Sequence, residues 1–163
     1  VEEAREMEGD RPALHLDHLR DRSAMNASAP YAKPLPKIDE RNGPHWQGNA
    51  AGELRVQQCD DCKNLRFPAS RWCPHCLGEK ASWAKTKGKG KVWSFCVFHR
   101  AYFKGFEPEL PYAVVLVELD EGPKLYSNLV GVPRDRIKIG MRVRAKFEKV
   151  TDDVTLAKFE EDK

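Results

Sequence analysis

Two Cys-x-x-Cys pairs decide how this chain can fold, one at Cys59 and Cys62 and the other at Cys73 and Cys76. Each pair fits a tight turn whose short spacing points both sulfur atoms at one ion, at roughly 2.3 Å for zinc. Four thiolates are the ligand set of a closed tetrahedral zinc site, so no position is left for water or a substrate. The sequence therefore predicts a structural Zn²⁺ held by these four cysteines.

Two other uses of this cysteine pattern stay open. Disulfide bonds would need an oxidising compartment. We recognise no apolar leader for export, so a reducing cytoplasm is expected. A rubredoxin-like iron site would use the same four thiolates, and zinc is favoured because the loops offer no other redox partner. His75 lies inside the second pair and is expected to be an exposed or supporting neighbour, since four better ligands exist.

Hydropathy and charge argue against two large classes of protein. The 163 residues are 40% hydrophobic and 33% charged. No stretch approaches the roughly 20 apolar residues of a membrane-spanning helix, so no membrane contact is expected. The 28 basic and 25 acidic residues give a net charge of +3, which is too balanced for a protein whose main task is to neutralise phosphates.

Residues 1–52 are expected to form an arm with short helices. His15 and His18 have the i, i+3 spacing of a helix face that can bind metal, but no further ligand is near, so a solvated face is favoured. Residues 29–44 hold four prolines, which remove backbone donors and favour extended structure. A short helix is expected at residues 43–52, with a proline in its first turn and a glycine at its end.

Residues 53–84 are expected to form a zinc ribbon. Residues 53–58 alternate in hydropathy and lead into the first cysteine pair, residues 65–68 return from it, and residues 82–84 leave the second pair. Residues 85–91 hold four lysines and two glycines. We interpret them as a basic, flexible turn, with phosphate binding as the less favoured use.

Residues 85–163 are expected to form an OB-fold domain. Five segments rich in β-branched and aromatic residues follow the lysine run. They are residues 92–99, 112–119, 124–130, 142–150 and 154–159. Five antiparallel strands in about 75 residues suit a five-stranded OB-fold barrel. The predicted fold class is therefore mainly β, with a helical and extended arm in front.

These pieces in this order resemble the DUF35 family, in which a rubredoxin-like zinc ribbon precedes an OB-fold. The resemblance covers roughly residues 33–160. Besides the four cysteines, it is carried by Lys33–Pro36, His45-Trp46, Gly52–Leu54, Phe67-Pro68, Gly88–Phe95, Pro111–Val115 and Ile139–Val143. Two positions depart from the family pattern. Lys63 stands where many relatives have glycine, and Leu77 precedes Gly78; neither removes a metal ligand.

The resemblance implies a partner role. Proteins of this family resemble accessory subunits of thiolase-fold enzymes that act on acyl-CoA. The OB-fold would then lie against the catalytic subunit and help to form the acyl-CoA channel. A CoA thioester of an aromatic or other acyl group would be the substrate of the complex. Within this group, the acidic arm and the size are similar to those of the small subunits of benzoylsuccinyl-CoA thiolases.

No catalytic residue is predicted in the chain itself. Thiolase chemistry needs a nucleophilic cysteine, an acid–base partner and an oxyanion hole. The only cysteine outside the ribbon is Cys96, which falls in mid-strand on the same side as Ser94 and Phe98. A cysteine there is expected to be buried packing without reactivity. The chain is therefore expected to complete the active site of a partner rather than to catalyse a reaction itself.

A loop after the first barrel strand is the candidate for ligand or partner contact. It places aromatic and basic side chains on the usual binding side of an OB-fold. These are Arg100, Tyr102, Phe103, Lys104 and Phe106. Their rings could stack on adenine or line a pantetheine channel, and their cations could pair with CoA phosphates. A hydrophobic loop that only closes the barrel or docks on a partner is the favoured alternative.

Nucleic-acid binding is the competing class of function. Zinc ribbons and OB-folds occur in such proteins, and Trp93, Phe95 and Phe98 are candidate stacking platforms. Aromatic residues in a strand are more often core, and the balanced charge argues against a broad phosphate track. We therefore do not expect nucleic acid to be the partner.

Overall fold

The computed structural model describes residues 31–163, which form one unit apart from residues 1–30. The acidic start of the expected arm and the pair His15 and His18 lie outside the described residues. Within residues 31–163, no helix is both long enough and apolar enough to cross a membrane. The proposed division at residues 52 and 84 stays a prediction.

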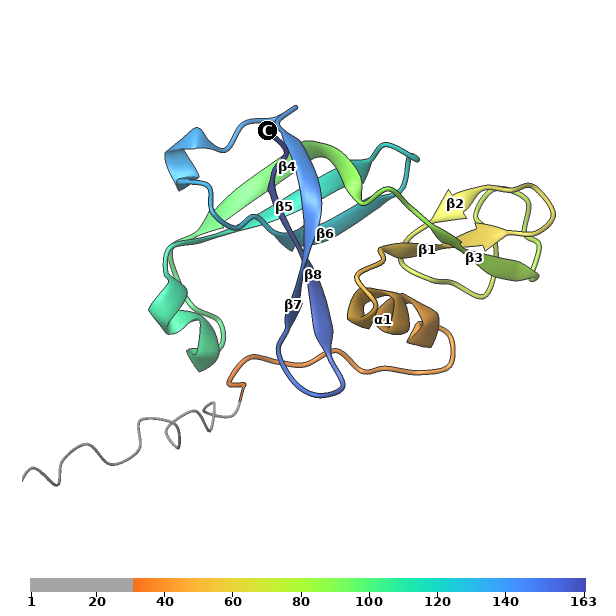
Figure 1. The fold of residues 1–163 in the computed structure, drawn as a ribbon, viewed down its shortest axis with the longest axis horizontal. Helices are drawn as coiled ribbons and strands as arrows, with labels where there is room; N and C mark the ends of the chain where they lie inside the picture. The colour runs from red at the N-terminus through yellow and green to blue at the C-terminus, as the bar shows by residue number, and fades with distance from the viewer. Residues whose placement is uncertain (1–30) are drawn as a thin grey trace, which may run out of the picture. The chain divides into compact units, whose positions relative to one another are not determined.

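The ribbon is a three-stranded antiparallel sheet preceded by one helix (Figure 1). Helix α1 (Gly43–Ala50) carries Pro44 in its first turn, as expected. The strands are β1 (Arg55–Cys59), β2 (Leu65–Arg66) and β3 (Ala81–Lys85), in the order β2-β1-β3. Gly48 lets the helix approach the start of β1 closely, because a Cβ there would lie 2.7 Å from the carbonyl oxygen of Glu53.

The second half of the described chain is a five-stranded antiparallel sheet that curls into a nearly closed barrel (Figure 1). Its strands are β4 (Lys89–Phe98), β5 (Tyr112–Leu119), β6 (Lys124–Asn128), β7 (Arg142–Lys149) and β8 (Thr155–Glu161). The strand order is β6-β5-β4-β7-β8. A parallel bridge between Leu129 and Phe159 brings the two edges of the sheet together. The OB-type barrel predicted from the sequence is therefore confirmed.

Two short 3-10 helices lie in the connections between barrel strands. Helix η1 (Lys104–Glu109) lies between β4 and β5, and η2 (Arg134–Arg136) lies between β6 and β7. The sequence predicted a connection at the place of η2, but it did not predict η1. The arm residue Ala32 packs against η1, because a Cβ at Gly105 would overlap the backbone carbonyl of Ala32.

The ribbon and the barrel share one hydrophobic core. Strand β5 alternates strictly, with every second side chain buried inside the barrel. Leu54 and Val56 from the ribbon side join the same buried cluster as Val115 and Phe159 of the barrel. Both the backbone amide and the hydroxyl of Thr86 donate to the carbonyl oxygen of Leu54 at 2.9 Å. These contacts tie the end of β3 to the start of β1, so the two parts are packed as one body.

The lysine run at residues 85–91 is a turn only in part, so the prediction of a turn over the whole run was wrong. Residues 86–88 connect β3 to β4, with a bend and a positive φ of 66° at Gly88. The lysines are exposed and the residues between them are buried. Lys85 ends β3, and the segment from Lys89 begins β4. Gly90 is required there because a Cβ would overlap the carbonyl oxygen of Glu118 on β5.

Candidate metal centre and ligand cavity

The two cysteine turns bring four sulfur atoms together. All four Sγ atoms lie within 4.8 Å of one another. In the first turn the amide of Lys63 donates to the carbonyl oxygen of Cys59 at 3.0 Å, and in the second turn the amide of Leu77 donates to that of Cys73 at 2.9 Å. Lys63 and Leu77 both have a positive φ, of 61° and 62°. The turns therefore have matching geometry although neither has glycine at this position.

The sulfur separations fit a tetrahedral zinc ion. Cys59 Sγ lies 3.6 Å from Cys76 Sγ, and Cys62 Sγ lies 3.6 Å from Cys73 Sγ. A tetrahedron with Zn–S bonds of roughly 2.3 Å has S–S edges of about 3.8 Å, whereas a disulfide bond is about 2.05 Å long. The donor set is therefore arranged for a tetrahedral metal ion such as Zn²⁺ and not for two disulfides. Four sulfur ligands leave no open position, so the ion's contribution there is structural.

The sulfur atoms differ in how readily they ionise. Burial opposes ionisation of Cys73, but hydrogen bonds from the amides of Cys76 and His75 outweigh it and lower its pKa to about 6. The amide of Gly78 favours the Cys76 thiolate, yet hydrogen bonds to the neighbouring sulfur atoms, with Cys62 first, raise its pKa to about 12. Four adjacent thiolates repel one another, and a dication removes that repulsion. Metal binding should therefore release protons.

The five loop residues expected to contact a ligand or partner do not act as one group. Tyr102 and Phe103 are 70% and 57% exposed. Phe106 is turned inward, with its ring stacked 4.9 Å from that of Tyr112 and the Lys33 ammonium 4.9 Å from its centroid. Arg100 is exposed, and Lys104 begins η1. The loop therefore offers an exposed aromatic pair rather than a ring of ligand contacts, and its binding role stays a prediction.

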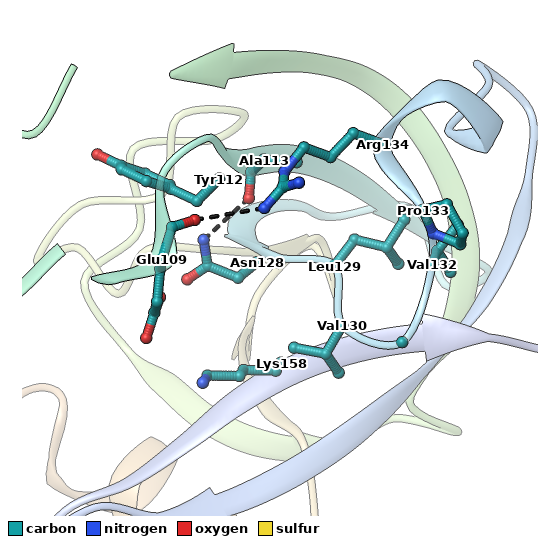
Figure 2. A pocket seen from close by; sticks show the side chains of 11 residues that line it. Glu109, Tyr112, Ala113, Asn128, Leu129, Val130, Val132, Pro133, Arg134 and Lys158 are labelled. Atoms are coloured by element: carbon teal, nitrogen blue, oxygen red, sulfur yellow. Dashed lines mark hydrogen bonds between the residues drawn. The ribbon is translucent and has the colours of Figure 1, made fainter. Parts of the chain in front are cut away.

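A cavity of about 330 Å³ opens beside this loop, and the sequence did not predict it (Figure 2). Its lining comes from the end of η1, from β5 and β6, from the segment that leads into η2 with the first residue of that helix, and from Lys158 of β8. Asn128 donates from Nδ2 to the carbonyl oxygen of Ala113 at 2.9 Å, and Arg134 donates from Nη2 to that of Glu109 at 3.4 Å. The guanidinium therefore contacts a neutral acceptor at the cavity wall.

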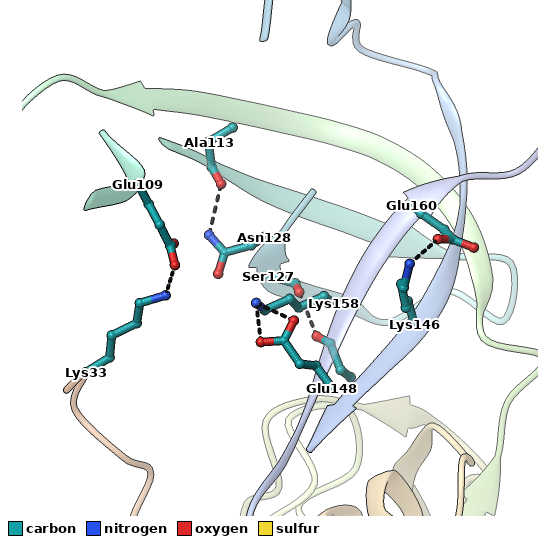
Figure 3. A network of polar contacts seen from close by, with 10 residues as sticks. Lys33, Glu109, Ala113, Ser127, Asn128, Lys146, Glu148, Lys158 and Glu160 are labelled. Carbon is teal, nitrogen blue, oxygen red and sulfur yellow. Dashed lines mark hydrogen bonds and ion pairs between the residues drawn. The ribbon is translucent and has the colours of Figure 1, made fainter. Parts of the chain in front are cut away.

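Ion pairs surround this cavity (Figure 3). Lys158 Nζ lies 2.7 Å from a carboxylate oxygen of Glu148, and Lys33 pairs with Glu109. Lys33 belongs to the expected arm, so this part of the arm lies beside the cavity wall. These lysines are already neutralised by carboxylates, which leaves Arg134 as the stronger candidate to attract an anion among the described lining residues.

Cys96 is exposed, so the expectation of a buried cysteine was wrong. It does lie in the row of Ser94 and Phe98, since the three residues pair with Leu116, Val114 and Tyr112 of β5 on the outer face of the sheet. That outer face is also apolar, because Val114 and Leu116 alternate with the buried residues of β5. Among the described residues, no acid–base group forms a hydrogen bond with the Cys96 sulfur. That Cys96 is not catalytic therefore stays a prediction.

Two family descriptions match successive parts of the chain. Residues 46–81 match the rubredoxin-like zinc ribbon domain of ChsH2, and residues 83–148 match the C-terminal OB-fold domain of ChsH2. The zinc ribbon and the OB-fold expected from the sequence are thus recognised independently of the coordinates.

Several curated proteins are similar in sequence. A probable enoyl-CoA hydratase alpha subunit of Thermomonospora curvata is 37% identical over 127 residues, covering 78% of this chain and 39% of that protein. The chain thus spans well under half of that relative's length. A DUF35 domain-containing scaffold protein of Methanocaldococcus jannaschii is 34% identical over 97 residues, covering 59% of this chain and 68% of that protein. The benzoylsuccinyl-CoA thiolase subunit BbsA of Thauera aromatica is 28% identical over 80 residues, covering 49% of this chain and 54% of that protein.

A solved structure with a similar fold matches over most of this chain. It is titled an Ltp2-ChsH2(DUF35) aldolase, with a TM-score of 0.71 and 36% sequence identity, and the match covers 78% of this chain and 98% of that one. The expected resemblance to the thiolase small subunit is therefore present, at lower identity than the matches to the hydratase subunit and to this aldolase chain.

Proposed function

The chain belongs to the DUF35 family, and from that membership we propose that it is a non-catalytic accessory subunit of an acyl-CoA enzyme. Relatives that are named as subunits of an enoyl-CoA hydratase and of a benzoylsuccinyl-CoA thiolase support this role. The observation that carries it is the closed four-cysteine site on a ribbon packed into the barrel core. Such a site can stabilise a fold but offers no position for a substrate.

The partner in this proposal is a thiolase-fold catalytic subunit. The exposed pair Tyr102 and Phe103 supports a docking role for the loop before η1, because large aromatic side chains are enriched where proteins bind one another. Loops that project from a rigid barrel commonly carry such contacts. Docking through this loop would place the partner beside the 330 Å³ cavity of Figure 2.

This cavity is the part of the proposed acyl-CoA channel that the chain itself would contribute. Its size is at the lower end of small-molecule sites, roughly 300–1,000 Å³, so it suits one segment of a long CoA thioester. Arg134 supplies a cation at the wall, and Asn128 holds the strand edge through its bond to Ala113. The proposed role of Arg134 is to bind a phosphate or carbonyl oxygen of the CoA moiety.

The test is a pull-down of the tagged chain from its native cell extract, followed by mass spectrometry of the captured proteins. A thiolase-fold protein in stoichiometric amount is the expected result. The matched variants are the double substitution Tyr102→Ala, Phe103→Ala and the control Ile139→Ala, since Ile139 is 71% exposed elsewhere. Only the double variant should lose the partner. Capture of nucleic acid, or of no thiolase-fold protein, would overturn the proposal.

A second experiment, on the kinetics of the complex, tests the proposed channel. In the purified complex, Arg134→Ala should raise the KM for the acyl-CoA about tenfold or more, with kcat little changed, because the residue binds the part of the substrate that does not react. Arg136→Ala, in the same 3-10 helix but outside the cavity lining, is the control. Equal kinetics for the two variants would exclude this cavity from the channel while leaving the subunit role intact.

A further inference from the structure

Strands β5 and β6 present an apolar face on the outside of the barrel. Val114 and Leu116 of β5 are only half-buried, and they alternate with residues that are fully buried in the core. Leu116 pairs across the sheet with Tyr126 of β6, which is 75% exposed. Apolar side chains scattered singly over a surface need no explanation, whereas neighbouring ones on one face indicate a binding site.

The loop before η1 continues this face. The ring of Phe98, at the end of β4, is stacked 5.2 Å from that of Tyr112, which begins β5 on the same side as Val114. The ring of Tyr102 meets that of Phe98 edge-on at 5.9 Å. The loop therefore lies against the outer side of the sheet. We call the following group the outer apolar surface: Tyr102, Val114, Leu116 and Tyr126.

Positive charge is in excess at the loop end of this surface. Arg100 and Lys104 flank the aromatic pair Tyr102 and Phe103 in the sequence, and both are exposed. Neither forms an ion pair with another residue of the part that the structure describes. The segment from residue 99 to residue 104 holds no carboxylate, and the next one along the chain is the exposed Glu107 of η1. Two cations thus stand against one acidic group.

The other end of the surface has the same excess. Glu118 follows Leu116 on the outer side of β5 and lies opposite Lys91 of β4 and Lys124 of β6 in the sheet register. The two ammonium groups share this one carboxylate, at 2.9 and 3.2 Å. The outer apolar surface therefore has a positive border at both ends.

We propose that the outer apolar surface docks the catalytic subunit, and that this partner meets it with an apolar patch bordered by carboxylates. The inference rests on the proposed function and adds to it the face of the barrel and the charge of the partner. The partner's patch covers Leu116 and Tyr126, and its carboxylates pair with Arg100 and Lys104. An apolar centre with a polar rim is the usual build of a protein interface. Opposite charges at such a rim chiefly speed association.

A second copy of the chain fits this surface less well. A two-fold dimer brings one patch against itself. Because both ends are positive, like charges would meet in either orientation of the second copy, and such juxtaposition opposes binding. A nucleic acid would be attracted by the cations, but it also needs rings on which its bases stack. Val114 and Leu116, in the centre, supply none.

The test uses the full-length, zinc-loaded chain and the purified catalytic subunit, with association and dissociation rates measured at 0.05 and 0.3 M salt. The double variant Arg100→Glu, Lys104→Glu should bind at least tenfold more weakly, mainly through slower association, and should lose the salt dependence of the original pair. The control Lys37→Glu, Lys80→Glu makes the same change of net charge at exposed lysines of the arm and the ribbon. It should change the affinity less than threefold.

A second variant tests the apolar centre. Tyr126→Ala should weaken binding about tenfold through faster dissociation and leave the salt dependence as it was, because it removes contact area and no charge. The control is Ile139→Ala, which truncates a similarly exposed side chain, 71% against 75%, outside the outer apolar surface. All four substituted positions of the two test and control pairs are on the surface, and thermal melting curves check that each variant is folded.

The outcomes separate this inference from the function on which it rests. If the charge-reversed variant or Tyr126→Ala bound the catalytic subunit as its control does, the docking surface would be wrong while the subunit role stood. Failure to capture any thiolase-fold protein would overturn both. A dimer of the chain that Tyr126→Ala dissociates would assign the surface to a second copy. Single-stranded DNA binding that Arg100→Glu, Lys104→Glu abolishes would assign it to a nucleic acid, and either result would overturn the inference.

Discussion

The ammonium group of Lys124 lies 3.9 Å from the centroid of the Trp93 ring. This cation covers one face of the aromatic residue that was the most exposed of the three candidate stacking platforms for a nucleic acid. The other two are also engaged. Phe95 packs against the barrel core, and the ring of Phe98 is stacked on that of Tyr112 at 5.2 Å. The aromatic residues of β4 are therefore committed to contacts inside the chain.

Absence of nucleic-acid binding is the first prediction. The lysines of the run at residues 85–91 are largely paired with carboxylates, as in Lys91 with Glu118 and Lys89 with Asp162 at 2.9 Å each. We expect no binding of single-stranded DNA or RNA at 0.15 M salt in a fluorescence-anisotropy titration. Binding with a steep salt dependence would contradict this prediction and favour the competing class of function.

Loss of the metal should unfold the chain. Cys73→Ser removes a fully buried ligand, and we expect the variant to bind no zinc and to lose its cooperative melting transition. Structural zinc contributes on the order of 10 kcal/mol of apparent free energy in small zinc domains. The measurements are metal content by mass spectrometry and melting followed by circular dichroism. Cys96→Ser is the matched control and should keep one zinc per chain; a stable, zinc-containing Cys73→Ser protein would refute the structural role.

Glycine at the two turn positions should stabilise the ribbon. A residue with a Cβ in the left-handed region costs roughly 1–2 kcal/mol, against roughly 0.5–1 kcal/mol for the extra freedom of an unfolded glycine. We therefore expect Lys63→Gly and Leu77→Gly each to raise the free energy of unfolding by about 0.5–1 kcal/mol. Lys80→Gly, exposed but without a positive φ, should lower it. The measurement is urea unfolding of the zinc-loaded proteins. If both turn glycines lowered the free energy of unfolding, the proposed backbone strain at Lys63 and Leu77 would be disproved.

Acidification should weaken the junction between α1 and the ribbon. Burial lowers the pKa of His45 in the folded chain below the value of 6.5 that it has when exposed. The unfolded chain therefore takes up a proton first as the pH falls. The stabilisation is complete above about pH 6.5 and is lost below it, by at most about 1.4 kcal/mol per pH unit until the folded pKa is reached.

The check is the free energy of unfolding between pH 7.5 and pH 5.5, measured with zinc present in excess. His45→Gln should flatten the curve in this range. The control His99→Gln, which changes an exposed histidine outside the ribbon, should retain the slope of the original protein. A slope that His45→Gln leaves unchanged would assign the pH dependence to other groups.

Thiol reactivity separates Cys96 from the metal ligands. All five cysteines of the chain are within the described residues, and four of them would be held by zinc. We expect a thiol reagent to modify one cysteine per zinc-loaded chain rapidly, and none in Cys96→Ser. The acyl transfer of the complex should be unaffected by that substitution, and its loss with the fold intact would make Cys96 a catalytic residue after all.

Local patterns were enough to predict most of the fold. The spacing of the cysteines predicted their convergence, and the run of Val and Leu in residues 112–119 predicted β5 with its bounds as observed. The lysine run carried a period of two, since its lysines alternate with Thr86, Gly88 and Gly90, but its composition suggested a turn instead. Reading the alternation before the composition would have placed the start of β4 correctly.

The cavity and the exposure of Cys96 could not be predicted in this way. Both faces of β5 are apolar, so alternation alone does not say which face of its neighbour β4 lies outside. The cavity depends on where Arg134, Asn128 and Lys158 meet, and these residues come from three segments that approach one another only in the closed barrel.

Leu54 and Val56 lie in the barrel core, while three residues further on Cys59 belongs to the metal site. An ion bound at one end of β1 therefore acts by mass action on the whole body, including surfaces that no sulfur atom touches. If the proposed partnership holds, the amount of assembled enzyme would follow the free zinc of the cell. Scarcity of the metal would then limit an acyl-CoA reaction whose chemistry uses no zinc from this subunit.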